Sequence, residues 1–134
     1  MLIISLEQCT LDMGLRVGGK ALGLGVLMRA GLPVPAGFVL TTEAYRVATR
    51  PIDAQIRSVM ADPHLPSQRK SENIASLFEQ LSLPAEVSQA IECACRALCE
   101  ADSPAPVAVR SSATAEDSAE ASFAGQQETY LWIR

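Results

Sequence analysis

Residues 111–127 place the strongest limit on how this chain can fold. These seventeen residues contain a single large apolar side chain, Phe123, and they separate two short apolar segments, 106–109 and 129–133. Both flanking segments have the composition and length of β-strands. The sequence therefore predicts two strands joined by a long stretch of small and polar residues, which cannot contribute much to a core.

Length and composition favour one folded domain covering residues 1–134. Hydrophobic residues make up 49% of the 134 residues and charged residues 19%, which is too apolar for a disordered chain. The net charge of −4 argues against a nucleic-acid binder, because such proteins concentrate Lys and Arg to replace counterions. No apolar run is long enough to span a membrane and no basic targeting segment begins the chain, so we expect a soluble, cytoplasmic protein.

Hydrophobic periodicity predicts an α+β fold in which several helices pack on a small, mostly antiparallel sheet. Gly31 suits the left-handed position that ends a helix, and Thr41 or Thr42 suits the N-cap of the helix that follows it. The last two amphipathic helices are expected to form a helical hairpin. The predicted strands are residues 1–6, 38–42, 107–109 and 129–133, and the predicted helices are residues 20–30, 43–50, 52–60, 71–83 and 87–101.

Two glycines and the cysteines bear on packing. Gly23 and Gly25 each cost about 1 kcal/mol relative to alanine inside a helix, which indicates that another segment packs closely against it. Cys93, Cys95 and Cys99 lack metal-ligand spacing, so we predict no metal site and interpret them as buried, reduced thiols. His64, the single histidine, lies between two prolines and is expected in a solvated loop.

A glycine-rich segment, "GLRVGGKA" at residues 14–21, is the first candidate site. It matches the G-x-x-x-x-G-K pattern of a phosphate-binding P-loop, but Ala21 stands where a P-loop needs Ser or Thr for magnesium. A P-loop also begins directly at the end of a strand, and a loop is expected here. Gly18 and Gly19 with free backbone amides at a helix N-terminus, beside Lys20, would still stabilise a phosphate. A glycine turn with a solvated lysine explains this segment equally well.

The second candidate site begins at Arg110, which stands at the end of a predicted strand. Its planar guanidinium suits fork-like contact with phosphate, and the small residues after it allow backbone amides to approach a ligand. Glu116, Asp117 and Glu120 would repel phosphate unless they face water or a metal ion. A phosphate-binding loop and a solvated hairpin loop therefore both remain open.

Together the two segments resemble a known family. "VGGKALGLGVLMRAGLPVPAGFVLTTEAYR" and "VAVRSSATAEDSAEASFAGQQETYL" cover some 55 of the 134 residues. They look like the start of the nucleotide-binding domain of phosphoenolpyruvate synthase, pyruvate phosphate dikinase and rifampicin phosphotransferase. The resemblance implies the N-terminal lobe of an ATP-grasp-like domain. In that family ATP phosphorylates a histidine on a separate swivelling domain, which then serves pyruvate or another acceptor.

The resemblance also assigns roles to individual residues. It implies phosphate contacts by Lys20 and by Arg110, the expected catalytic residue, and a lid that closes over ATP from residue 111 to 125. The ATP-binding residues implied in this way are Gly18, Gly19, Lys20, Arg110, Ser111, Ser112, Ala113, Thr114 and Gly125. The ligands for Mg²⁺ are expected on a second lobe that this chain lacks.

We therefore expect residues 1–134 to be an incomplete N-terminal lobe of such a domain. Its partners would be ATP, the missing C-terminal lobe and the phosphohistidine domain, and it is not expected to be active alone. The alternative is a non-catalytic interaction module that kept this fold and buries an apolar face in a homo-oligomer or against another protein.

Overall fold

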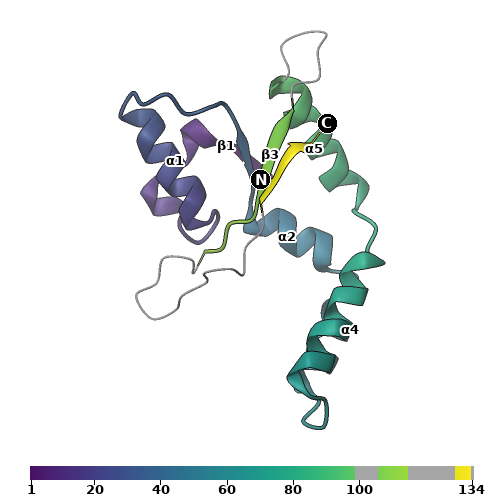
Figure 1. Ribbon diagram of the computed structural model, residues 1–134. Coiled ribbons are helices and arrows are strands. Elements are labelled where there is room, and N and C mark those ends of the chain that lie inside the picture. Colours follow the sequence, from purple (N-terminus) through teal and green to yellow (C-terminus); the bar gives the residue numbers. More distant parts are fainter. Residues whose placement is uncertain (99–105, 115–128, 134) are drawn as a thin grey trace.

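The computed structural model describes residues 1–98, 106–114 and 129–133 and confirms an α+β fold (Figure 1). The described residues form five α-helices, two short 3₁₀ helices and two separate two-stranded antiparallel sheets. None of the helices in these ranges is long and apolar enough to cross a lipid bilayer. In chain order the elements are β1 (Ile3–Ser5), η1 (Leu6–Gln8), η2 (Leu11–Met13), α1 (Gly19–Arg29), β2 (Phe38–Leu40), α2 (Thr42–Thr49), α3 (Asp53–Ala61), α4 (Ser67–Glu79), α5 (Ala85–Leu98), β3 (Val107–Arg110) and β4 (Thr129–Ile133).

Strands β1 and β2 pair antiparallel and lead directly into α2 through Thr41. Ile4 pairs with Val39, and Ile4 is buried in the core. Thr41 is 1% exposed and is the N-cap of α2, because its Oγ1 accepts a hydrogen bond from the Ala44 amide at 3.4 Å. The same hydroxyl donates to the Met1 carbonyl at 3.0 Å. Thr41 therefore connects the N-terminus of the chain to the start of α2. The sequence predicted the N-cap, with Thr41 or Thr42 in that position, but not the hydrogen bond to Met1.

Replacing Thr41 with alanine is expected to lower the free energy of unfolding by about 2 kcal/mol. An N-cap contributes about 1 kcal/mol and a buried hydrogen bond contributes about the same. Thr41→Ser keeps both hydrogen bonds and is the matched control, with an expected loss of less than about 1 kcal/mol. Urea unfolding followed by circular dichroism measures both variants; equal stability of Thr41→Ala and wild type would show that the hydroxyl contributes nothing.

Helix α1 packs on η1 so closely that one of its glycines has no room for a side chain. A Cβ added at Gly25 would lie 2.4 Å from the Cys9 carbonyl oxygen and 3.0 Å from that of Leu6. A Cβ at Gly23 would meet no atom within 4 Å. The prediction of close packing is therefore confirmed at Gly25 and wrong at Gly23, which faces outward because the two positions lie on different sides of the helix.

The end of α1 follows the prediction. Gly31 has φ +77° and its amide donates to the Met28 carbonyl at 3.0 Å, while the Leu32 amide donates to the Leu27 carbonyl at 3.1 Å. This pair of bonds is the Schellman motif, which needs a left-handed residue at the position of Gly31. The chain reverses here toward β2.

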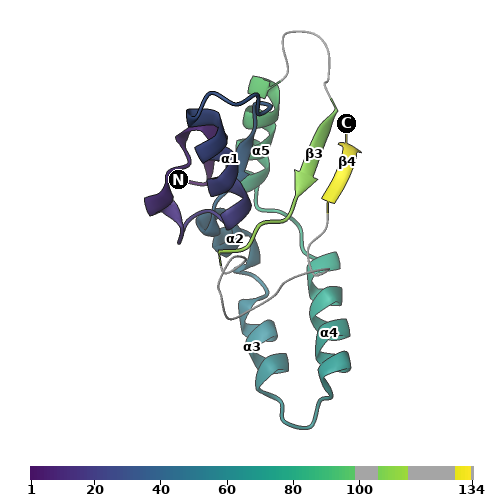
Figure 2. The same cartoon turned by 60° about the vertical axis from the view of Figure 1, so that its left-hand side comes forward.

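The expected hairpin of the last two helices is wrong, because α4 pairs with α3 instead. Figure 2 shows α3 and α4 side by side, joined by the short loop 62–66, while α5 contacts α2 and β1. Two prolines end the helical pattern within this loop, so α3 and α4 meet as antiparallel neighbours. The apolar stripe of α4 is only half-buried; Phe78 is 38% exposed, with its ring centroid 6.5 Å from that of Tyr45.

The cysteines also depart from the expectation. Cys93 is exposed and Cys95 is partly exposed, so the prediction of buried thiols is wrong for Cys93; Cys99 lies outside the described residues. Helix α5 buries only Val87 completely, because the other elements cover just part of its apolar side. Cys9 is the buried thiol; burial raises its pKa, an effect that the charge of Arg29 partly opposes.

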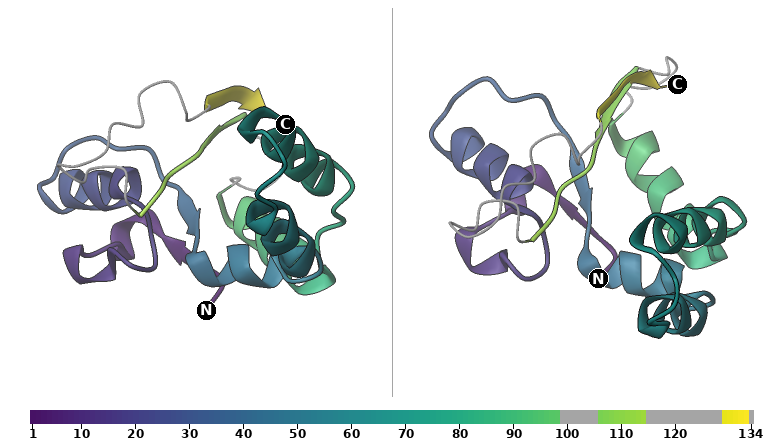
Figure 3. Two further views of the ribbon diagram at one scale, coloured as in Figure 1. Left: turned by 90° about the horizontal axis from the view of Figure 1, so that it is seen from below. Right: turned by 60° about the horizontal axis from the view of Figure 1, so that its bottom comes forward.

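The prediction of a single small sheet is wrong. Strands β3 and β4 form a separate two-stranded ribbon and do not join β1 and β2. Val109 pairs with Tyr130, and the register shifts between Val107 and Val109. All of β4 is exposed, including Trp132 at 76%. Figure 3 shows the chain continuing from β3 toward the start of α1, where Ser111 and Ala113 accept hydrogen bonds from Lys20 and Gly19.

Candidate functional site

The glycine-rich turn between η2 and α1 is anchored in the core. The amide of Val17 donates to the Met13 carbonyl at 3.0 Å, and Val17 is 2% exposed. Gly18 follows as the N-cap of α1. The turn is preceded by a 3₁₀ helix rather than a strand, and Ala21 is buried at 4% exposure. Both features agree with the exclusion of a P-loop.

Two segments that lie some ninety residues apart in the sequence meet at Gly18. The Gly19 amide donates to the Ala113 carbonyl at 3.3 Å, and the Lys20 ammonium donates to the Ser111 carbonyl at 3.2 Å. A Cβ added at Gly18 would lie 2.0 Å from the Ser112 Oγ and 2.8 Å from the Ala113 amide nitrogen. The two candidate segments therefore come together as one candidate site, and their close contact requires glycine at position 18.

The backbone amides at the start of α1 are used differently from the expectation. The Gly19 amide is engaged by Ala113, and the amides of Ala21 and Leu22 both donate to the Gly18 carbonyl. The prediction of a free amide at Gly19 is therefore wrong. An ammonium group carries three donors, so Lys20 can bind Ser111 and a second acceptor at the same time.

Arg110 enters this site from β3. Arg110 is the last residue of the strand, it pairs with Thr129 in the register of β3 and β4, and it is exposed. The next residue, Ser111, supplies the carbonyl that Lys20 binds, so the structure brings Lys20 and Arg110 to the same short segment. Ser112, Ala113 and Thr114 continue that segment.

Part of the expected site falls outside the described residues. Gly125 and most of the expected lid lie there, and so do Glu116, Asp117 and Glu120. In the part of the chain that the structure describes, no group of three or more His, Cys, Asp or Glu side chains could hold a metal ion. Among the described site residues, Lys20 and Arg110 supply cationic donors of the kind that suit phosphate, and there is no set of carboxylates of the kind that suits Mg²⁺.

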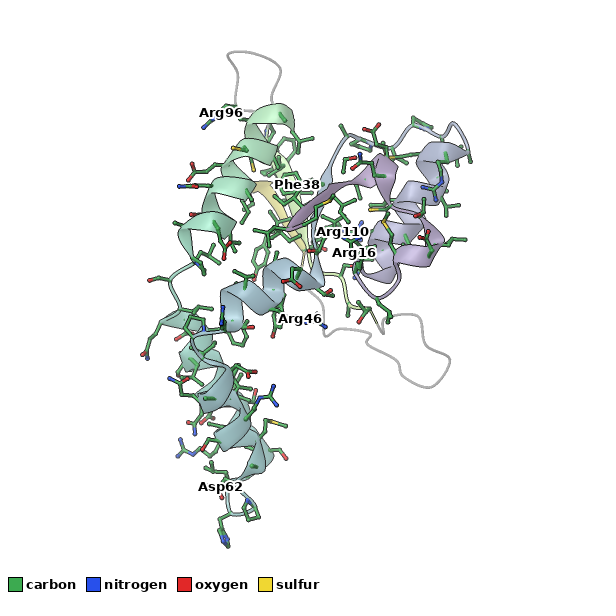
Figure 4. The ribbon with its side chains drawn as sticks, turned by 180° about the vertical axis from the view of Figure 1, so that it is seen from behind. Arg16, Phe38, Arg46, Asp62, Arg96 and Arg110 are labelled. Atoms are coloured by element: carbon green, nitrogen blue, oxygen red, sulfur yellow. The ribbon has the colours of Figure 1, made fainter. Side chains whose placement is uncertain are left out.

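The turn also contains Arg16, an exposed residue that is not among the predicted site residues. Its backbone amide donates to the Met13 carbonyl at 2.8 Å, and its carbonyl accepts from the Thr42 amide at 2.9 Å. Figure 4 labels both Arg16 and Arg110. Arg16 lies two residues before Gly18 in the sequence.

An apolar hollow of about 490 Å³ lies along α1 beside this site. Leu22 and Val26 line it from α1, and Leu11 lines it from η2. Gly19 is shared between the hollow and the site, and none of the described residues that line the hollow is charged. It therefore offers contacts for an apolar group and none for phosphate.

Comparison with known proteins points to the same family as the resemblance of the two segments. Residues 15–134 match the family model described as the pyruvate phosphate dikinase AMP/ATP-binding domain. The chain is 43% identical, over 99% of its length, to the phosphoenolpyruvate synthase of Aeropyrum pernix. It is 42% identical to a probable phosphoenolpyruvate synthase of Methanocaldococcus jannaschii over 87% of its length, and 46% identical to the rifampicin phosphotransferase of Streptomyces sviceus over 86%.

The chain spans only 17%, 10% and 14% of the lengths of these three relatives. The family match nevertheless covers all but the first fourteen residues of the chain, including residues 18–20 and 110–113 of the candidate site. The resemblance predicted from those segments is confirmed. The chain belongs to the pyruvate phosphate dikinase AMP/ATP-binding domain family.

Proposed function

We propose that this chain binds the phosphates of ATP where residues 18–20 meet residues 110–113, as part of a phosphotransferase similar to phosphoenolpyruvate synthase. One observation carries the proposal. The two segments are far apart in the sequence, yet Gly18 lies against Ser112 and Lys20 binds the Ser111 carbonyl at 3.2 Å. The family description, which names AMP and ATP binding, supports the same ligand.

The proposed roles follow from the chemistry of each group. The Lys20 ammonium and the Arg110 guanidinium neutralise and orient phosphate oxygens, with Arg110 able to contact two oxygens at once. Gly18 allows residues 112 and 113 to approach the start of α1. Magnesium bound with ATP would neutralise further phosphate charge, and its ligands would lie outside the described residues.

We further propose that residues 1–134 are one incomplete N-terminal lobe of an ATP-grasp domain. In-line phosphoryl transfer needs donors on both sides of the phosphate, and the described residues supply one side. The second lobe and a phosphohistidine domain would then complete the enzyme, in the same chain or in another. The chain matches only 17% and 10% of the lengths of two relatives, which supports the proposal of an incomplete lobe. The comparisons do not favour the alternative of an interaction module.

Titration of the 134-residue chain with ATP, followed by amide NMR, tests the proposal. Shifts are expected at residues 18–20 and 110–113. Lys20→Ala and Arg110→Ala should each weaken binding about tenfold, because each removes a charge-assisted contact of roughly 1.5 kcal/mol. Lys70→Ala is the matched control, since Lys70 also donates to one backbone carbonyl, that of Met60 at 2.8 Å, but lies on α4.

The free energy of unfolding of the control and of the two site variants should lie within about 0.5 kcal/mol of the wild-type value, as is usual when a surface side chain is replaced. Unchanged ATP binding in both Lys20→Ala and Arg110→Ala would contradict the proposed site. Equal weakening by Lys70→Ala would show that the loss comes from net charge alone.

A further inference from the structure

We propose that Thr42 is a positioning residue for the candidate ATP site and holds the glycine-rich turn in the arrangement that binds phosphate. This inference rests on the proposed function, because it concerns the same turn. Thr42 is the first residue of α2 and lies outside both segments of the candidate site, residues 18–20 and 110–113. Its effect on a ligand would therefore pass through the backbone of the turn.

Thr42 binds the turn twice. Its amide donates to the Arg16 carbonyl at 2.9 Å, and its hydroxyl donates to the Leu15 carbonyl at 3.1 Å. The amide belongs to the first turn of a helix, where amides have no partner within the helix, so the turn supplies the missing acceptor. The hydroxyl can make its contact because Thr41, and not Thr42, is the N-cap of α2. One residue of α2 thus binds two consecutive carbonyls of the turn.

The same two peptide groups are also bound at their amide ends. The amides of Arg16 and Val17 both donate to the Met13 carbonyl, at 2.8 Å and 3.0 Å. A peptide group is planar, so one bond at its carbonyl and another at its amide fix its orientation. Val17 is also buried, at 2% exposure. The backbone that leads into α1 is therefore held by Thr42 on one side and by Met13 on the other.

Gly18 follows directly after these peptide groups, so their orientation decides where the two segments of the site meet. Gly18 is buried, and a Cβ there would lie 2.0 Å from the Ser112 Oγ. Lys20 comes next in the first turn of α1 and binds the Ser111 carbonyl. A turn that is ordered before ATP arrives loses less conformational entropy on binding, which strengthens the binding.

Titration of the 134-residue chain with ATP, followed by amide NMR, tests this role in Thr42→Val. Valine keeps the branched shape and the backbone amide, and it removes only the hydroxyl that binds the Leu15 carbonyl. ATP affinity should fall about threefold to fivefold, the loss expected from one hydrogen bond. Thr42→Ser restores the hydroxyl, and its affinity should lie within about twofold of the wild-type value.

Thr49→Val is the matched control. Thr49 is the last residue of the same helix, and its hydroxyl also donates to a backbone carbonyl, that of Tyr45 at 2.9 Å. Valine at this position removes an equivalent hydrogen bond and leaves the contacts of the turn intact. Its ATP affinity should therefore stay within about twofold of the wild type, even where its stability falls.

Amide hydrogen exchange without ATP separates positioning from a general loss of stability. In Thr42→Val the amides of Arg16 and Val17 should exchange about threefold faster than in the wild type, because the turn opens more often. The Tyr45 amide donates to the Thr41 carbonyl at 3.1 Å and reports on the start of α2. It should keep its wild-type exchange rate.

The outcomes separate this inference from the proposed function. Wild-type ATP affinity in Thr42→Val, together with weaker binding in Lys20→Ala, would overturn the role of Thr42 and leave the phosphate site standing. Equal weakening in Thr42→Val and Thr42→Ser, or in Thr42→Val and Thr49→Val, would also overturn it, because the loss would not come from the hydroxyl at the turn. Absence of ATP binding by the wild-type chain at millimolar concentrations would overturn both proposals for this chain.

Discussion

Gly25→Ala is expected to lower the free energy of unfolding by about 2 kcal/mol, whereas Gly23→Ala, two positions earlier in the same helix, should raise it by about 0.5–1 kcal/mol. The methyl group at position 25 would lie 2.4 Å from the Cys9 carbonyl oxygen, a backbone atom that cannot rotate away. The same carbonyl also accepts a hydrogen bond from the Arg29 guanidinium. Helix α1 would therefore have to move off η1 or displace that bond.

The two glycine variants control for each other, because both gain the helix propensity of alanine and only one meets a neighbour. Urea unfolding gives the difference between them, about 3 kcal/mol, more reliably than either absolute value. Stabilisation by both substitutions would show that α1 and η1 are not packed as closely as the structure has them.

Gly18→Ala is expected to weaken ATP binding more than tenfold, a larger loss than that of Lys20→Ala. The added Cβ would lie 2.0 Å from the Ser112 Oγ, 2.8 Å from the Ala113 nitrogen and 2.8 Å from the Ser112 carbonyl carbon. The φ of −81° at Gly18 suits alanine, so the effect comes from crowding rather than from backbone strain. Residues 112 and 113 would have to separate from the start of α1, which removes the geometry that Lys20 and Arg110 share.

Gly14→Ala is the matched control for this prediction, because a Cβ there would be 3.9 Å from its nearest neighbours in the same turn. Its ATP affinity should stay within about twofold of the wild type, as expected for a surface substitution. Ser112→Ala should not rescue Gly18→Ala, since two of the three crowding atoms belong to the backbone. The amide shifts of Gly19 and Ala113 report directly whether the hydrogen bond between them is lost. Wild-type affinity in Gly18→Ala would contradict the proposed contact.

Much of the local structure could be predicted from the sequence. Thr41 begins α2, Gly31 ends α1, and most helix bounds lie within a few residues of the prediction. These features depend on neighbours a few positions away, through capping bonds and allowed backbone angles. Which helix packs on α4, and whether β3 and β4 join the sheet of β1 and β2, depend on tertiary contacts that local patterns do not report, and the sequence predicted both incorrectly.

The candidate site divides in the same way. Lys20 and Arg110 could be named from the sequence because each stands at the end of a predicted element and matches a family pattern. The contact between Gly18 and Ser112, which joins the two segments, matches no such pattern and is seen only in the structure. The roles of all the predicted ATP-binding residues stay predictions, and Gly125 lies outside the described residues.

The sequence by itself determined the fold class, the ends of helices and the family of this protein, because capping residues, periodicity and short motifs act over a few neighbouring positions. Only the tertiary structure decided that Gly18 and Gly25 must be glycine while Gly23 need not be, and that residues 18–20 meet residues 111–113. The physical reason is that periodicity reports which side of an element is apolar, whereas close packing depends on the segment that covers it.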